Sequence, residues 1–126
     1  MALQTVTLTW NLKDFLQVGI PDSCILYITP NNVMADTTDS LIIPALTRTV
    51  AFSGGVGSIS GVVANDSAAL SPGNTSYEIL IFDPANNTVL VPPFAVQVNH
   101  ANGATQDLSV LWLNQAATPQ PLVHYL

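Results

Sequence analysis

The strongest constraint on the fold is an alternating run near the N-terminus, from Gln4 to Trp10. Val6, Leu8 and Trp10 fall on one side of an extended chain, and threonines occupy the positions between them. Period-two alternation with β-branched residues is typical of a strand that buries one face. No stretch of ten or more residues combines helical periodicity with capping residues. The chain is therefore expected to be all-β.

Further strands are expected wherever apolar runs are bounded by turn residues. We expect residues 11–17 to form one helical turn at most, and residues 31–40 and 65–75 to be loops. The strands are predicted at residues 4–10, 23–29, 41–52 (one bent strand or two short ones), 56–64, 76–82, 88–91, 94–98 and 106–113. This pattern predicts one Ig-like or jelly-roll-like antiparallel β-sandwich of about seven or eight short strands. The sandwich covers residues 1–113, and an extended, Pro-containing C-terminal arm covers residues 114–126.

Charge is scarce in this chain and excludes several classes of function. Lys and Arg together number two, and Asp and Glu together number eight, so 8% of the residues are charged. An average domain has about a quarter charged residues. With a net charge of −6 it lacks a basic surface for phosphates, and no nucleic-acid binding is expected. Its apolar runs are too short for a spanning helix, so no membrane insertion is expected. Met1 to Thr5 lack the features of a secretory signal.

We find no combination of residues that indicates catalysis. Cys24 lies in an apolar run and is expected to be a buried hydrophobic residue rather than a reactive thiol. His100 and His124 have no neighbouring metal ligands at a suitable spacing. Asp36 and Asp39 are close in sequence but lie in a polar segment without an aromatic platform. The prediction is a non-enzyme with no catalytic, cofactor-binding or metal-binding residues and no cofactor.

The low charge favours a surface that other protein chains cover. Its polarity comes from Ser, Thr, Asn and Gln, which cost less to desolvate than ions. The C-terminal arm can order on a neighbouring subunit or pack back on its own domain. We predict that its apolar residues bind a partner, namely Leu122, Val123, Tyr125 and Leu126. A sugar-binding platform is an alternative role for the aromatic residues, which otherwise belong to the core: Trp10, Tyr27, Tyr77, Trp112 and Tyr125.

Several segments carry a resemblance to a known family. The segments are Gly19-Ile20-Pro21-Asp22-Ser23-Cys24, Ala64-Asn65-Asp66, Leu70-Ser71-Pro72-Gly73-Asn74-Thr75-Ser76-Tyr77-Glu78-Ile79, Val91-Pro92-Pro93-Phe94-Ala95-Val96-Gln97-Val98 and Gln106-Asp107-Leu108. Together they resemble the small β-sandwich domain of minor tail proteins of tailed bacteriophages. In that family a Pro-Gly-x-x-Tyr turn enters a strand and a later Asp-Leu closes the domain. The similarity spans about residues 5–111.

The resemblance implies a virion structural protein, assembled in the host cytoplasm, whose partners are other virion proteins and copies of itself. A minor tail or baseplate subunit is the first expectation. The family domain often precedes a long fibre or receptor-binding region, whereas here about fifteen residues follow it, which favours an adaptor role. A capsid decoration protein is the close alternative. A carbohydrate-binding adhesion module, with a host-surface glycan as its partner, is the second alternative.

Overall fold

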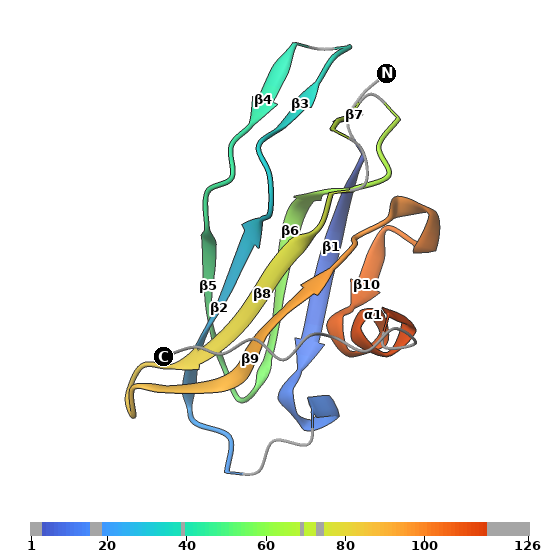
Figure 1. Ribbon diagram of the computed structural model, residues 1–126. Helices are drawn as coiled ribbons and strands as arrows, with labels where there is room; N and C mark the ends of the chain where they lie inside the picture. Colours follow the sequence, from blue (N-terminus) through green and yellow to red (C-terminus); the bar gives the residue numbers. More distant parts are fainter. Residues whose placement is uncertain (1–3, 16–18, 39, 69, 73–74, 116–126) are drawn as a thin grey trace.

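A curled seven-stranded sheet forms most of the molecule. The computed structural model describes residues 4–15, 19–38, 40–68, 70–72 and 75–115. The sheet order is β10-β1-β6-β5-β2-β8-β9, and the sheet bends into a half-barrel (Figure 1). Its strands are β1 (Thr5–Asn11), β2 (Ser23–Pro30), β5 (Arg48–Ser53), β6 (Val56–Val63), β8 (Tyr77–Asp83), β9 (Thr88–Val96) and β10 (Thr105–Asp107). The chain was predicted to be all-β, and the described residues are mostly β, with one short helix, α1 (Leu108–Gln115).

A small three-stranded sheet stands at one end of the half-barrel. Its order is β4-β3-β7, and β3 and β4 form a hairpin that projects beyond the large sheet (Figure 1). The strands are β3 (Met34–Asp36), β4 (Leu41–Ile43) and β7 (Leu70–Ser71). The predicted run 41–52 is therefore two strands in different sheets, divided at Pro44. Residues 31–40 and 65–75, which were expected to be loops, contain β3 and β7.

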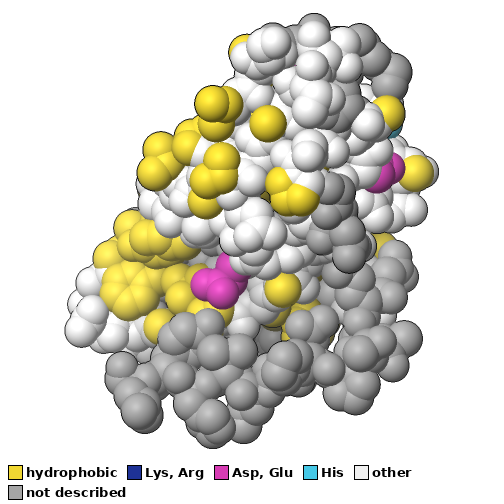
Figure 2. Space-filling model, turned by 45° about the horizontal axis from the view of Figure 1, so that its top comes forward, with side chains coloured by type: hydrophobic (Ala, Val, Ile, Leu, Met, Phe, Trp, Pro, Cys, Tyr) yellow, Lys and Arg dark blue, Asp and Glu magenta, His cyan; other side chains and the backbone are white. Residues whose placement is uncertain are grey.

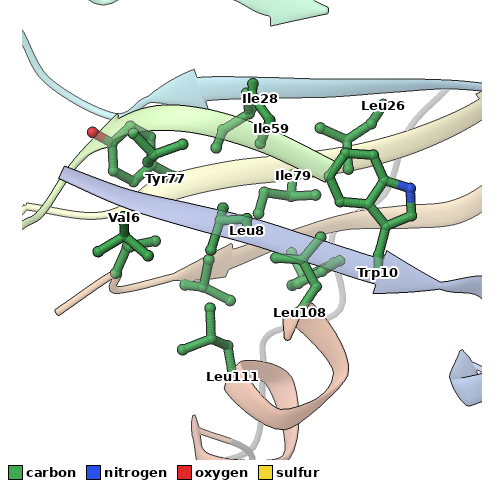
Figure 3. Close-up of a cluster of buried hydrophobic side chains, with 14 of the residues drawn as sticks. Val6, Leu8, Trp10, Leu26, Ile28, Ile59, Tyr77, Ile79, Leu108 and Leu111 are labelled. Atoms are coloured by element: carbon green, nitrogen blue, oxygen red, sulfur yellow. The ribbon is translucent and has the colours of Figure 1, made fainter. Parts of the chain in front are cut away.

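The alternation in β1 has the predicted consequence. Val6, Leu8 and Trp10 are buried, and they face apolar side chains from β2 and β8 across the inside of the curl (Figure 3). Leu26, Ile28 and Ile79 lie in this cluster. The core thus lies within the curve of the large sheet. Residues Leu12–Phe15 form a 3-10 turn, η1, which confirms the expected single turn after β1.

The predicted strand 106–113 is wrong. Only β10 is extended there, and Leu108–Gln115 form the helix α1. The Asp107 carboxylate accepts hydrogen bonds from the Ser109 N–H (2.8 Å) and hydroxyl (2.5 Å), an arrangement that caps a helix N-terminus. Leu108 and Leu111 then share a buried helical face (Figure 3). Val110, on another side of the helix, is exposed.

Helix α1 bridges the two ends of the curled sheet. It contacts β10 and β1 on one side and β9 on the other. The Trp112 ring packs edge-on against Phe94 of β9, with ring centroids 5.0 Å apart. Because α1 fills the gap between these strands, the half-barrel buries its core without a second large sheet.

Two features of strand pairing also differ from the prediction. The sheet is mixed rather than wholly antiparallel, because β10 pairs with β1 in parallel. The runs 88–91 and 94–98 belong largely to one strand, β9, which continues through Pro92 and Pro93. β9 is the end strand of the sheet, the position where proline is tolerated, and its register against β8 shifts near these prolines.

Within the described residues, no helix is long and apolar enough to cross a membrane.

Candidate interaction surfaces

Four of the eight exposed large hydrophobic side chains of the described residues lie on or next to the β3–β4 hairpin. Ile42 is 74% exposed and Leu46 is 67% exposed, and Val33 and Leu41 are also exposed. These residues, Val33, Leu41, Ile42 and Leu46, are called the hairpin surface below. Figure 2, in which the hairpin end is turned toward the reader, shows several groups of hydrophobic side chains and few acidic ones.

Local sequence explains why the hairpin surface is exposed. β3 pairs with β4 through Met34 and Ile43, which places Val33 next to the segment that follows β4. Met34 is buried, whereas β4 is the end strand of a sheet three strands wide and has little protein to pack against. Residues 41–46 contain no ionisable side chain. Edge strands are usually protected by charge, and an apolar edge strand tends to pair with another chain.

A groove of about 290 Å³ lies at the base of the hairpin. It is called the hairpin groove and is lined by Ile28, Pro30, Ile43, Pro44, Leu46, Arg48, Gly61, Val62, Val63 and Tyr77. The groove exists because β5 and β6 pair only at their turn, through Ser53 and Val56, and then separate. Its lining is apolar apart from Arg48 and the hydroxyl of Tyr77.

Arg48 crosses from β5 to β6 at this groove. Its guanidinium donates to the carbonyls of Ser60 (3.0 Å) and Gly61 (3.2 Å). β6 is bulged at this point, because two of its residues stand opposite Thr7 of β1. Gly61 has a φ of +68°, which suits the left-handed position of a glycine bulge. Arg48 is one of the two basic Lys and Arg residues of the chain, and its charge is used to hold backbone carbonyls. The groove therefore presents no strongly basic surface.

A second groove, of about 330 Å³, lies on the outer face of β2, β8 and β9. It is called the outer-face groove and is lined by Tyr27, Thr29, Thr47, Glu78, Leu80, Phe82 and Val89. Tyr27 and Phe82 meet edge-on with ring centroids 6.4 Å apart, and the Thr29 and Thr47 hydroxyls are 2.8 Å apart. Glu78 is exposed and is the one carboxylate in this lining.

Two neighbouring polar side chains, buried Asn65 and exposed Asp66, hold the loops near the hairpin end. Asn65 donates from Nδ2 to the Thr75 hydroxyl (2.8 Å), and its Oδ1 accepts from the Val98 N–H (2.7 Å). The Asp66 carboxylate accepts from the N–H groups of His100 (2.7 Å) and Ala101, at the start of the 3-10 turn η2 (His100–Asn102). Asn65-Asp66 therefore ties the segment before β7 to the segment after β9, and we assign it a structural role.

The structure separates the residues suggested for a sugar platform. Trp10 and Tyr77 are buried, and Trp112 packs on Phe94, so these three do not form a surface platform. Tyr27 lines the outer-face groove, and Tyr125 lies outside the described residues. The core role that was expected for most of these residues holds for Trp10 and Tyr77, and Tyr27 has Phe82 as an aromatic neighbour.

The predicted partner-binding residues Leu122, Val123, Tyr125 and Leu126 lie outside the described residues, as do His124 and Asp39. Cys24 is buried and free, as predicted, and burial, with a smaller contribution from Asp83, raises the pKa of its thiol. Within the part of the chain that the structure describes, no three His, Cys, Asp or Glu side chains form a metal site.

Sequence reasoning missed both grooves and the hairpin surface. The run 41–52 was predicted as one bent strand or two short ones, but an apolar run does not reveal whether its faces are covered. One signal was available: Pro44 limits β4 to three residues, which is too short to cross a core.

Comparison of the chain with protein-family models, with curated proteins and with solved structures finds no match. The geometry of these surfaces therefore carries the functional argument.

Proposed function

We propose that this protein is a structural subunit of a bacteriophage virion, most specifically a minor tail or baseplate component. It acts by protein–protein contacts, in the virion, with copies of itself and with other virion proteins. The observation that carries the proposal is the hairpin surface, where the exposed apolar side chains of Leu41, Ile42 and Leu46 project from a chain with few charges. Surfaces of this kind mark interaction sites, and charge depletion is typical of the centre of an interface.

The strand order supports the finer assignment of an Ig-like sandwich. Three strands of the half-barrel, β1-β6-β5, follow the order B-E-D, and the next three, β2-β8-β9, follow C-F-G. The β5–β2 pair joins the two groups into one curled sheet. Tyr77 stands at the start of the F-like strand, and its hydroxyl donates to the carbonyl of Val63 (2.6 Å) at the end of the E-like strand β6, which ties the two groups of strands together. The resemblance to phage tail domains agrees with such a sandwich, although a fold by itself does not specify function.

Two alternative functions are each supported by a feature of the surface. A capsid decoration protein would use the same uncharged surface to bind the phage head. A carbohydrate-binding adhesion module is favoured by the outer-face groove, where the Tyr27 ring, the threonine hydroxyls and the Glu78 carboxylate lie together. Such groups can contact the faces and hydroxyls of a sugar.

The hairpin surface can be tested by placing charge on it. We expect the purified chain to self-associate with rising concentration in sedimentation velocity, and the double variant Ile42→Lys/Leu46→Lys to remain monomeric. Val56→Lys is the matched control, because Val56 is also exposed but lies at the β5–β6 turn. If the unaltered chain is a monodisperse monomer and binds a sugar, the structural proposal is overturned and the adhesion alternative is supported.

The location within the virion is tested by neighbouring genes. A tape-measure gene nearby favours the tail or baseplate, and an adjacent capsid gene favours decoration. Detection of the chain in purified particles by mass spectrometry tests the virion assignment itself. Its absence from particles would contradict all forms of the structural proposal.

A further inference from the structure

The outer-face groove and the segment beyond α1 have complementary chemistry. The groove combines the half-buried side chains of Tyr27, Leu80 and Phe82 with exposed Val89. Residues 116–126 contain no Asp, Glu, Lys or Arg, and the segment 122–126 is apolar apart from His124. The side chains of Leu122, Val123 and Leu126 can therefore enter this groove without burying an unpaired charged group.

The position of α1 brings this segment within reach. Trp112 packs against Phe94 of β9, and Val89 lies five residues back along the same strand, a distance of about 17 Å at the rise of a β-strand. Seven residues lead from Gln115 to Leu122, and an extended chain of that length spans up to about 25 Å. Residues 122–126 can therefore reach the groove of the same molecule without help from a second copy.

The charges of the two partners also match. Glu78 is the one carboxylate in the groove lining, and Tyr27 is the other ionisable group there. The cross-strand neighbours of Glu78 are Thr29 and Ala95, neither of which ionises. His124 is the one basic side chain in residues 116–126. Near pH 6 an ordinary histidine is largely charged, so His124 can pair with Glu78 at the rim of the groove.

We propose that residues 122–126 dock in the outer-face groove of their own chain, with Leu122, Val123 and Leu126 against its apolar lining and His124 beside Glu78. The partner of these residues is thus the protein itself. This inference does not depend on the hairpin surface or on a virion role. The sequence allows the C-terminal arm either to order on a neighbouring subunit or to pack on its own domain, and this proposal selects the second.

Cross-linking of paired cysteines tests the docked position. Val89→Cys/Val123→Cys places one thiol in the groove and one on the segment. Ile42→Cys/Val123→Cys is the matched control, because Ile42 is more exposed than Val89 but lies on the hairpin. Cys24 is buried and its thiol pKa is raised, so it should stay unmodified. Circular dichroism of each variant verifies that it has folded.

With a short bismaleimide at low protein concentration, we expect the Val89 pair to form an intramolecular link at least about tenfold faster than the Ile42 pair, since docking raises the effective concentration. Equal rates for the two pairs would overturn the proposal. Links that form only between molecules would also overturn it, and would show that the segment binds a second copy.

A charge reversal tests the rim contact at pH 6. Glu78→Lys should slow the Val89–Val123 link about two- to fivefold, the range expected for an exposed ion pair. Adding His124→Glu to Glu78→Lys should restore the rate by recreating an opposite pair. An unchanged rate in Glu78→Lys, or no recovery in the double variant, would contradict the proposed placement of His124.

Discussion

Replacing Gly57 by Ala should destabilise the fold through a single contact. Gly57 lies on β6 directly opposite Trp10 of β1. An added Cβ would stand 2.6 Å from Cζ2, 2.7 Å from Cε2 and 2.8 Å from Nε1 of the indole. Trp10 is buried and meets Phe52 edge-on at 5.4 Å between ring centroids. The indole therefore cannot move away without disturbing a second aromatic ring.

The size of the effect follows from two opposing contributions. Carbon atoms pack best at about 3.5–4.0 Å, so the indole must shift by roughly 1 Å. Overpacking of this kind costs about 1–3 kcal/mol. Gly57 has no positive φ, so alanine by itself would fit the strand and gain about 0.5–1 kcal/mol over glycine. The expected net loss in the free energy of unfolding is centred on about 1 kcal/mol and is at most about 2.5 kcal/mol.

Urea unfolding followed by far-ultraviolet circular dichroism measures this loss. Trp10→Phe removes the clashing part of the indole, so the double variant Gly57→Ala/Trp10→Phe should lose about 1 kcal/mol less than the two single losses combined. Ser58→Ala, at the next and exposed position, controls for alanine in β6. The reasoning is refuted if Gly57→Ala is neutral or stabilising, or if the double variant is additive.

Two further predictions concern buried polar groups. Tyr77→Phe removes the hydroxyl that donates to the Val63 carbonyl and should cost about 0.5–1.5 kcal/mol in urea unfolding at pH 7. Burial raises the pKa of Tyr77 from 10.0 to about 12, so the folded chain keeps a proton that the unfolded chain loses. The free energy of unfolding of the unaltered chain should therefore fall by roughly 2–3 kcal/mol between pH 10 and 12. Tyr77→Phe, which has no ionisable hydroxyl at this position, should not show this loss. An equal dependence of the unfolding free energy on pH in the two proteins would contradict the prediction. Asn65→Ala should cost about 2–4 kcal/mol, because the buried Val98 N–H and Thr75 hydroxyl lose a partner, and a loss under about 0.5 kcal/mol would exclude the proposed loop anchor.

The part of the fold that could be predicted depends on local pattern. β1 was predictable because alternation and β-branched residues specify both a strand and its buried face. α1 was not, because Leu108, Val110 and Trp112 fit period two while Leu108, Leu111 and Trp112 fit a helix. The capping contact of Asp107 decides between them, and it depends on a side-chain orientation that the sequence does not display.

The candidate surfaces could not be predicted for a different reason. A groove depends on where strands separate, and β5 and β6 separate through a combination of their turn, the Gly61 bulge and the Arg48 bridge. The outer-face groove depends on strand order, which places Tyr27 of β2 beside Phe82 of β8. Both arrangements join residues that are far apart in the sequence, so a local pattern carries no sign of them.

The few charges of this chain contribute less to its outer surface than their number suggests. The carboxylates of Asp36, Asp66, Asp83 and Asp107 accept backbone N–H groups in turns or at the starts of helical segments. Arg48 donates to backbone carbonyls. These charges stabilise connections between strands, a structural task that a longer, more regular turn could perform without ions. None of these charges lies within residues 41–46, so the exposed apolar edge of the hairpin carries no local charge that would oppose pairing with a second chain.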